Sequence, residues 1–328
     1  MGGQPQGDRC RAHGRPGAKD AEAAGHTVEE TINRVRRDVK LAYFDLALVI
    51  ESARITGDNR QVLEQLAQIA QTRYAVGQST QADVLKAQTE LSKMSDELIK
   101  LERERRNAEA ELDKALGRAT DRPAPIPRLP ELWAGSLKLD LLRETALTSR
   151  PQLRALETTI TRNEKAADLA RKDYYPDFDV RFSYGQRDKT AMGERRDDMI
   201  SLTVAINLPI WGASKQGPKV AEAVAMREQS ARMLDAQRNE LLSMLKQQVA
   251  AADQGFRSAR LYETTVLVQS RLAVESALAA YKVNRVDFLT LLDSQMTLFN
   301  YEINHITAIV NQRKALAEIE FITGTEIL

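Results

Sequence analysis

The 328-residue sequence contains few of the residues that build disulfides and metal sites. Its single cysteine, Cys10, cannot form an internal disulfide or a thiolate metal cluster, and it lacks the preceding apolar run of a lipoprotein signal. The three histidines, His13, His26 and His305, have no partner at the spacing of metal ligands. The sequence therefore predicts no metal site and no other cofactor.

Long hydrophobic runs and an excess of charge of one sign are also missing. The longest apolar runs, such as residues 46–50, contain five residues, whereas a transmembrane helix needs about 18 or more. The 47 Lys and Arg residues nearly balance the 46 Asp and Glu residues, so the formal charge of +1 gives no electrostatic case for nucleic-acid binding. With 43% hydrophobic residues, the chain is too apolar to be disordered.

Proline is absent from two long stretches, residues 17–122 and 219–328. Because proline breaks helix interiors, these stretches permit very long helices. Apolar residues recur in them at alternating steps of three and four, the heptad pattern of helices that pack side by side. In the first stretch the pattern includes Val28, Ile32, Val35, Val39, Ala42, Leu46, Val49 and Ala53. Neighbouring helices are needed to cover such a long seam.

Each stretch contains a turn, and the two stretches are copies of one another. Gly77 favours a left-handed turn that divides a first helical hairpin, residues 20–117. A shift of 207 residues superposes the stretches without a gap and aligns Tyr74 with Tyr281 and Gly77 with Asn284. Asparagine also tolerates left-handed geometry, so a second helical hairpin is expected over residues 219–328, with its tip near residue 284.

The segment between the two hairpins differs in composition. Residues 118–150 hold four prolines in their first part and predict an extended connector, followed by a short amphipathic helix at about residues 136–148. Pro151 then opens a helix expected to run to residue 176.

Residues 177–208 alternate between apolar and polar side chains and predict a β-hairpin. Phe178, Val180 and Phe182 alternate with Asp179 and Arg181, and the second strand follows the same pattern. Strands of about nine to eleven residues with one apolar face are typical of outer-membrane barrels. A half-buried hairpin in a soluble sheet is equally compatible with this segment alone. Residues 209–218 form the connector to the second helical hairpin.

One stretch invites an enzymatic interpretation. Residues 212–219 contain two glycines and end in Lys219 between a strand and a helix, as in a phosphate-binding loop. However, Pro218 removes an N–H that a phosphate would need, and Val220 offers no hydroxyl for magnesium. The sequence therefore predicts that the protein is not an enzyme.

The order of these elements resembles the TolC-like family of trimeric outer-membrane efflux channels. The similarity covers residue 20 to the C-terminus and rests on the order of short motifs together with the repeat. The motifs are residues 73–77 with 83–85, 149–153, 170–178, 208–210, and 281 with 292–295. The resemblance implies a mainly α fold, with long antiparallel α-helical hairpins that form a coiled-coil tunnel and one transmembrane-type β-hairpin of a trimeric α/β-barrel channel.

The same resemblance implies a function and partners. In this family, three subunits form a twelve-strand barrel in the outer membrane and a helical tunnel across the periplasm. The tunnel meets a periplasmic adaptor and an inner-membrane pump of a tripartite efflux or type I secretion system. The expected protein is therefore a passive conduit that contacts outer-membrane lipid through its β-hairpin and binds no nucleic acid.

The family resemblance also implies site residues at the two tips. Three copies of Asp293 would form a carboxylate ring at the pore aperture, and such rings select cations. The family pattern can carry another carboxylate one turn earlier, where this chain has Thr290. The residues expected to contact the adaptor are Tyr74, Gly77, Asp83, Tyr281, Asn284 and Arg285.

Two other classes of protein share some of these features. A soluble coiled-coil scaffold would explain the heptads but not the alternating hairpin or the repeat. A periplasmic adaptor-like protein would contain one helical hairpin with flanking β-domains, which this sequence does not predict.

The N-terminus departs from the family pattern. Residues 1–19 are rich in glycine and arginine and are expected to be disordered or misread, with no signal peptide. Subtracting 207 from Leu208 gives residue 1, so the strands of the first copy would precede this chain. We expect an N-terminally truncated chain in which a trimer has three times two, or six, strands; such a chain would form the helices without conducting ions.

Overall fold

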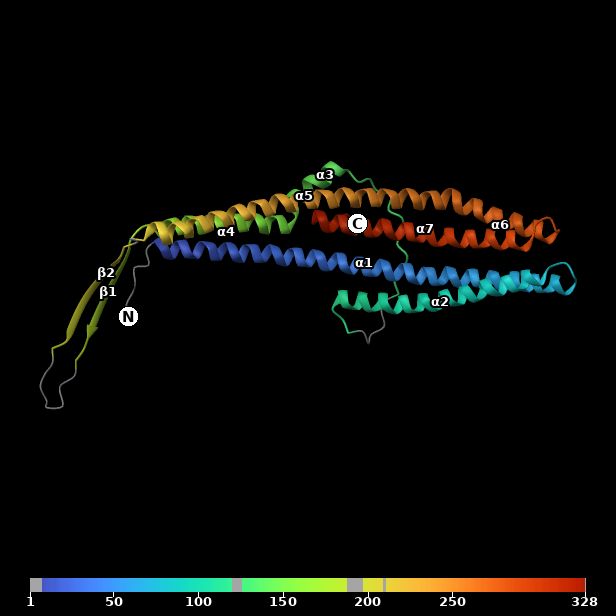
Figure 1. Cartoon of the computed structure of the whole chain (residues 1–328), viewed down its shortest axis with the longest axis horizontal. Helices are drawn as coiled ribbons and strands as arrows, with labels where there is room; N and C mark the ends of the chain where they lie inside the picture. The colour runs from blue at the N-terminus through green and yellow to red at the C-terminus, as the bar shows by residue number, and fades with distance from the viewer. Residues whose placement is uncertain (1–7, 120–125, 188–196, 209–210, 328) are drawn as a thin grey trace. The chain divides into compact units, whose positions relative to one another are not determined.

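The computed structural model describes residues 8–119, 126–187, 197–208 and 211–327, and most of them are helical (Figure 1). The fold is mainly α with one β-hairpin, as the sequence predicts. No helix in these ranges is long and apolar enough to span a membrane.

The elements follow one another as two helical hairpins separated by a helix pair and a strand pair. They are α1 (Asp8–Ala75), α2 (Gln81–Leu116), α3 (Leu139–Ser149), α4 (Pro151–Lys172), β1 (Asp177–Gly185), β2 (Met199–Asn207), η1 (Gly212–Gln216), α5 (Gly217–Leu261), η2 (Tyr262–Val266), α6 (Leu267–Lys282) and α7 (Phe288–Thr323). The two η elements are single π-helical turns.

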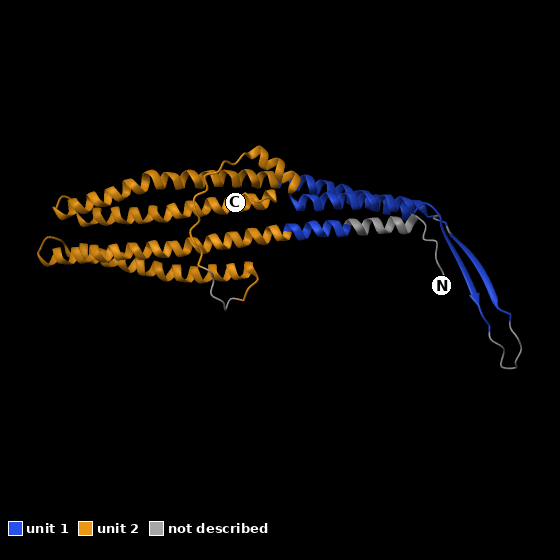
Figure 2. Cartoon of the chain, turned by 180° about the vertical axis from the view of Figure 1, so that it is seen from behind, with its two compact units in different colours: residues 1–30, 150–240 blue, residues 31–149, 241–328 orange. Residues whose placement is uncertain are grey.

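The chain divides into two compact units (Figure 2). Unit 1 comprises residues 1–30 and 150–240, and unit 2 comprises residues 31–149 and 241–328. Unit 1 carries the β-hairpin, and unit 2 carries the turns of both helical hairpins.

Unit 2 is built around α7, the helix with the most buried residues. Its apolar side chains pack against those of α1, α2 and α6 in one cluster. Members of this cluster include Leu63, Leu66, Ala70, Ala87, Met94, Ala277, Phe288, Leu291 and Phe299. Of the heptad seam of α1, Leu46 is buried, whereas Val28, Ile32 and Val35, nearer the N-terminus, are exposed.

The connector between the two hairpins is held against α7 by side chains. Gln312, which is 1% exposed, donates from Nε2 to the Trp133 carbonyl oxygen at 2.7 Å and accepts from the Trp133 N–H at 3.0 Å. Arg313 donates to the Glu131 carbonyl at 2.7 Å. A Cβ added to Gly255 of α5 would lie 2.9 Å from Cβ of Gln312, so only glycine permits this approach of α5 to α7.

Unit 1 contains polar contacts between its helices. Asn163 of α4 donates to the Ser230 hydroxyl of α5 at 2.8 Å, and both side chains are buried. Arg150, which is also buried, lies 2.9 Å from a carboxylate oxygen of Glu30 on α1. A buried polar group costs free energy unless it is hydrogen-bonded, so these pairs favour one alignment of the helices.

The β-hairpin has a regular antiparallel register. Phe178 pairs with Ile206 and Phe182 with Leu202 on one face, while Arg181 pairs with Thr203 on the other. The two strands are the only ones among the described residues, and they form a two-stranded sheet. The side chains of the apolar face are largely exposed: Phe178, Val180, Phe182, Tyr184, Ile200, Leu202, Val204 and Ile206.

The structure differs from the sequence-based expectations at the N-terminus of the chain. Helix α1 begins at Asp8, so residues 8–19 are helical rather than disordered, and residues 1–7 lie outside the described range.

Helix α4 ends at Lys172, four residues before the expected end. The reason is Pro176, which cannot continue a helix and disfavours helical geometry at the preceding residue.

The connector before the second helical hairpin is not extended throughout. It contains the π-helical turn η1, and α5 starts at Gly217 with Pro218 in its first turn, a position that needs no backbone N–H. A second π-helical turn, η2, interrupts the long arm that the sequence predicts as one uniform helix.

Candidate functional site at the hairpin tips

The tip of the first hairpin is a tight turn closed by backbone hydrogen bonds. Gly77 has φ of +74°, and its N–H donates to the Tyr74 carbonyl at 3.0 Å. The Gln78 N–H donates to the Arg73 carbonyl at 2.8 Å. A left-handed residue after a helix is most often glycine, because glycine has no Cβ to clash.

Helix α2 then begins with a capping box. The Thr80 hydroxyl accepts from the Asp83 N–H at 3.2 Å, and the Asp83 carboxylate accepts from the Thr80 N–H at 3.0 Å. The Ser79 hydroxyl donates to the same carboxylate at 2.7 Å. Partial burial opposes ionisation of Asp83, but the hydrogen bonds from Thr80 and Ser79 outweigh it and lower its pKa below the ordinary value.

The second tip repeats this geometry with different residues. Asn284 has φ of +59°, and its N–H donates to the Tyr281 carbonyl at 3.1 Å. Asp287 caps α7 and accepts from the Thr290 N–H at 2.9 Å and from the Thr290 hydroxyl. These hydrogen bonds, the hydroxyl first, lower the pKa of Asp287.

The two helix caps use the same two residue types, an aspartate and a threonine, in opposite order. The repeat aligns Thr80 with Asp287 and Asp83 with Thr290, so each tip has one acid and one threonine in opposite order. Both orders satisfy the N–H groups at the start of a helix, because either side chain can accept at the N-cap. In the sequence this signal is an acid and a threonine three residues apart, and it gives Thr290 a capping role beside its expected place at the aperture.

One side chain joins the two tips to each other, and sequence reasoning missed its role. The guanidinium of Arg73 lies over the ring of Tyr281 and donates to the Tyr281 carbonyl. Tyr281 is 4% exposed and packs edge-on against Phe288, with ring centroids 5.8 Å apart. Tyr281 is therefore a buried support of the second tip rather than part of its surface.

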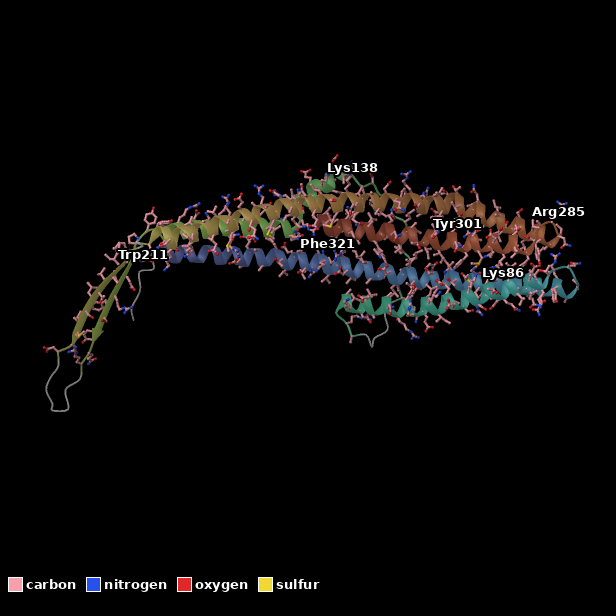
Figure 3. All side chains as sticks on the ribbon, viewed as in Figure 1. Lys86, Lys138, Trp211, Arg285, Tyr301 and Phe321 are labelled. Atoms are coloured by element: carbon pink, nitrogen blue, oxygen red, sulfur yellow. The ribbon has the colours of Figure 1, made fainter. Side chains whose placement is uncertain are left out.

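The outer surface of the tips presents apolar side chains to solvent. Those on the first tip are Tyr74, Val76 and Leu85, and those on the second are Val283 and Leu289. Gly77, Asn284 and Arg285 are exposed beside them, and Asp83 is partly exposed. Figure 3 labels Arg285 at the second tip and Lys86 near the first. Both tips lie at the same end of unit 2, as the Arg73 contact requires.

The predicted aperture residues, Thr290 and Asp293, lie three residues apart at the start of α7, and both are exposed. The Thr290 hydroxyl is engaged by Asp287, whereas the Asp293 carboxylate makes no hydrogen bond or ion pair with any described residue. The repeat places Lys86 at the position of Asp293, and Lys86 lies 3.2 Å from Glu90. The charge in the first copy is therefore paired within its own helix, and the charge in the second copy is exposed and unpaired among the described residues.

No group of three or more potential metal ligands occurs in the described part of the chain. Exposed apolar side chains and one carboxylate can contact another protein or an ion in passage. They do not assemble a nucleophile with a base, as covalent catalysis would require.

Comparison with known proteins gives a family match over most of the chain. The sequence pattern of a family described as outer membrane efflux protein matches residues 5–118 and 142–325. The match begins at residue 5, so it includes most of residues 1–19, which were expected to depart from the family pattern.

Two relatives have informative descriptions. The chain is 24% identical to the cobalt-zinc-cadmium resistance protein CzcC of Cupriavidus metallidurans, over 93% of this chain and 72% of that protein. It is also 24% identical to the pyoverdine export outer membrane protein OpmQ of Pseudomonas putida, over 80% of this chain and 58% of OpmQ.

Solved structures share the fold. The outer-membrane channel OprN superposes with a TM-score of 0.86 at 18% identity, covering 97% of this chain and 72% of OprN. The outer membrane protein VceC of Vibrio cholerae superposes with a TM-score of 0.85 at 17% identity, covering 98% of this chain and 77% of VceC.

Proposed function

This chain belongs to the outer membrane efflux protein family, and we propose that its two hairpin tips form the aperture and the adaptor-binding end of the channel. The chain is a subunit of an outer-membrane efflux channel, located in the outer membrane and periplasm. Members of the family form homotrimeric channels that work with adaptor and inner-membrane pump partners. The family is one of passive channels and not of enzymes.

The aperture proposal rests on the exposed Asp293 carboxylate, which no described side chain neutralises. In a homotrimer, three copies of this residue on equivalent helices would form one ring of negative charge. The Thr290 hydroxyl is bound to Asp287 and adds no charge, so the ring would be single. A ring of this kind attracts cations and repels anions at the mouth of a pore.

The adaptor-binding proposal rests on the exposed residues of the tips. Tyr74, Gly77, Asp83, Asn284 and Arg285 would contact the adaptor together with the apolar side chains around them. Interfaces commonly surround such an apolar centre with polar residues. Tyr281 would act from beneath, by holding Phe288 and Arg73 in place.

The lipid-contact proposal rests on the alternation of the β-hairpin. Its apolar face would meet the hydrocarbon of the outer membrane, and the face with Arg181 and Thr203 would line the channel. A two-stranded sheet is marginal in water, and strands of neighbouring subunits would complete its hydrogen bonds.

Cross-linking tests the aperture. In a Cys10→Ser background, which removes the only native cysteine, Asp293→Cys in the assembled trimer should give covalent dimers with a short bismaleimide. Asp140→Cys is the matched control, because the Asp140 side chain on α3 is 98% exposed. It should remain monomeric on denaturing gels. Failure of Asp293→Cys to cross-link in a sample that migrates as a trimer would overturn the aperture assignment.

A further inference from the structure

Exposed aromatic side chains lie at both roots of the β-hairpin, the segments that join β1 to α4 and β2 to α5. Tyr175 lies two residues before β1 and is 72% exposed, and Trp211 follows β2 and is 69% exposed. Asp177 pairs with Asn207 in the register, so the two roots lie at the same end of the hairpin. Figure 3 labels Trp211 at this junction. Exposed tryptophan and tyrosine next to an apolar surface are typical of the boundary between hydrocarbon and water in a membrane.

The helix ends at this junction are held together. A Cβ added to Gly212 would lie 3.4 Å from the Tyr174 ring, and one added to Gly217 would lie 3.4 Å from the Tyr174 hydroxyl. Lys219 of α5 lies 2.5 Å from Asp173, which follows α4. The aromatic residues after α4 and the residues of η1 therefore share one surface.

An unneutralised lysine lies on the same surface. Lys215 of η1 is exposed, and its side chain forms no hydrogen bond or ion pair with the described residues. Arg171 and Lys219, at the adjoining helix ends, pair with Asp168 at 2.9 Å and with Asp173 at 2.5 Å. Their charges are therefore neutralised locally, whereas that of Lys215 is not.

We propose that this root patch, consisting of Tyr174, Tyr175, Trp211 and Lys215, binds the headgroups of anionic phospholipids. The inference rests on the proposed lipid contact of the β-hairpin and adds the lipid class. The patch lies at the end of the hairpin nearest the helices, which is the level of the headgroups once the apolar face lies in hydrocarbon. The aromatic rings provide the interfacial anchor, and Lys215 provides the preference for negative over zwitterionic lipid.

Vesicle flotation of the full chain tests the lipid class. Partition should be stronger into phosphatidylcholine vesicles that contain phosphatidylglycerol than into phosphatidylcholine alone. Lys215→Gln should weaken partition into the anionic vesicles about fivefold, the factor expected for one lysine near an anionic surface. The same variant should leave partition into neutral vesicles unchanged, and Lys215→Arg should restore binding.

The control variant is Lys138→Gln, which removes one exposed positive charge in unit 2. It should bind both vesicles as the unmodified chain does. Equal partition of the unmodified chain into both vesicles would overturn the headgroup inference and leave the lipid contact of the hairpin standing. Absence of partition into either vesicle would overturn both.

Fluorescence quenching provides an independent readout of depth. The chain has two tryptophans, and the Trp133 ring packs over Gly135 in unit 2. Lipids brominated close to the headgroup should quench the emission of Trp211 more than lipids brominated near the chain ends. Trp211→Phe should abolish the part of the fluorescence that the brominated lipids quench. The placement would be wrong if Trp211→Phe left the quenching by both lipids unchanged.

Discussion

The guanidinium carbon of Arg73 lies 4.5 Å from the ring centroid of Tyr281, although the two residues are 208 positions apart in the sequence. The Tyr281 carbonyl accepts two hydrogen bonds, one from Arg73 and one from the Asn284 N–H that closes the second turn. One side chain of the first hairpin thus stabilises the turn of the second. The position that the repeat aligns with Arg73 is Ala280, so the contact has no counterpart in the other direction.

Replacing Arg73 by glutamine should loosen the second tip. The substitution removes a cation–π contact and a hydrogen bond from a charged donor, together about 1–2 kcal/mol. Backbone amides of residues 281–287 should then exchange hydrogen about five to thirty times faster in mass spectrometry. Arg73→Lys should recover only part of the protection, because an ammonium group lacks the planar fork of a guanidinium.

Tyr281→Phe is the matched control for this contact. The Tyr281 hydroxyl is buried and has no hydrogen-bond partner among the described residues, so its removal should leave exchange at the tip unchanged or slower. The ring remains under Arg73 and against Phe288. Faster exchange in Tyr281→Phe than in Arg73→Gln would show that the hydroxyl, and not the ring contact, stabilises the tip.

The caps predict acid sensitivity of the tips. Hydrogen bonding lowers the pKa values of Asp83 and Asp287 below the ordinary value of an aspartate. Because the folded pKa values lie below the unfolded ones, the caps contribute full stability above about pH 4 and lose it as the pH falls through the folded values. Hydrogen exchange at both tips, corrected for its intrinsic pH dependence, should therefore accelerate as the pH falls below about 4.

Asparagine variants isolate this effect. Asp83→Asn and Asp287→Asn keep a side-chain acceptor at each cap, and at the N-cap, where Asp287 lies, asparagine is as favourable as aspartate. The double variant should resemble the unmodified chain at neutral pH but show a weaker acid response at the tips. An undiminished acid response would assign the effect to other groups.

Local patterns predicted most of the elements. The proline-free heptads gave the long helices, and the alternation after Pro176 gave β1 and β2, because both periods are determined by neighbours a few residues apart. The turns at Gly77 and Asn284 were visible for the same reason: a left-handed residue must follow the helix.

Contacts between distant segments could not be predicted in this way. Nothing near Arg73 in the sequence indicates that its guanidinium covers Tyr281, and nothing near Gln312 indicates a clamp on Trp133. These contacts depend on how the two hairpins align. The aperture role of Asp293 came from family resemblance, and the structure adds that its carboxylate is exposed.

Few side chains should be able to replace Gln312, whose two hydrogen bonds to the Trp133 backbone clamp the connector to α7. Gln312→Glu replaces the donor to the Trp133 carbonyl by a carboxylate and buries a charge, so we expect a loss of about 2–4 kcal/mol of local stability. In a Trp211→Phe background, the emission of Trp133 should shift to the red as the connector leaves α7. Gln247→Glu on α5 is the control, because Gln247 is exposed. The Trp133 emission should not shift in this variant. An unshifted Trp133 emission in Gln312→Glu would show that the clamp does not hold the connector.

The two faces of the β-hairpin should respond unequally to the same added charge. Leu202 lies on the apolar face opposite Phe182, and Thr203 lies on the polar face opposite Arg181. If the apolar face lies in hydrocarbon, Leu202→Arg should weaken partition into neutral phosphatidylcholine vesicles by about 2–4 kcal/mol, the cost of arginine near the bilayer centre. Thr203→Arg should lose much less, because its charge stays on the polar face and adds only the repulsion of Arg181, about 0.2–1 kcal/mol. Vesicle flotation of both variants measures the difference. Equal losses of partition in the two variants would mean that neither face lies in hydrocarbon. The hairpin would then be a half-buried element of a protein surface.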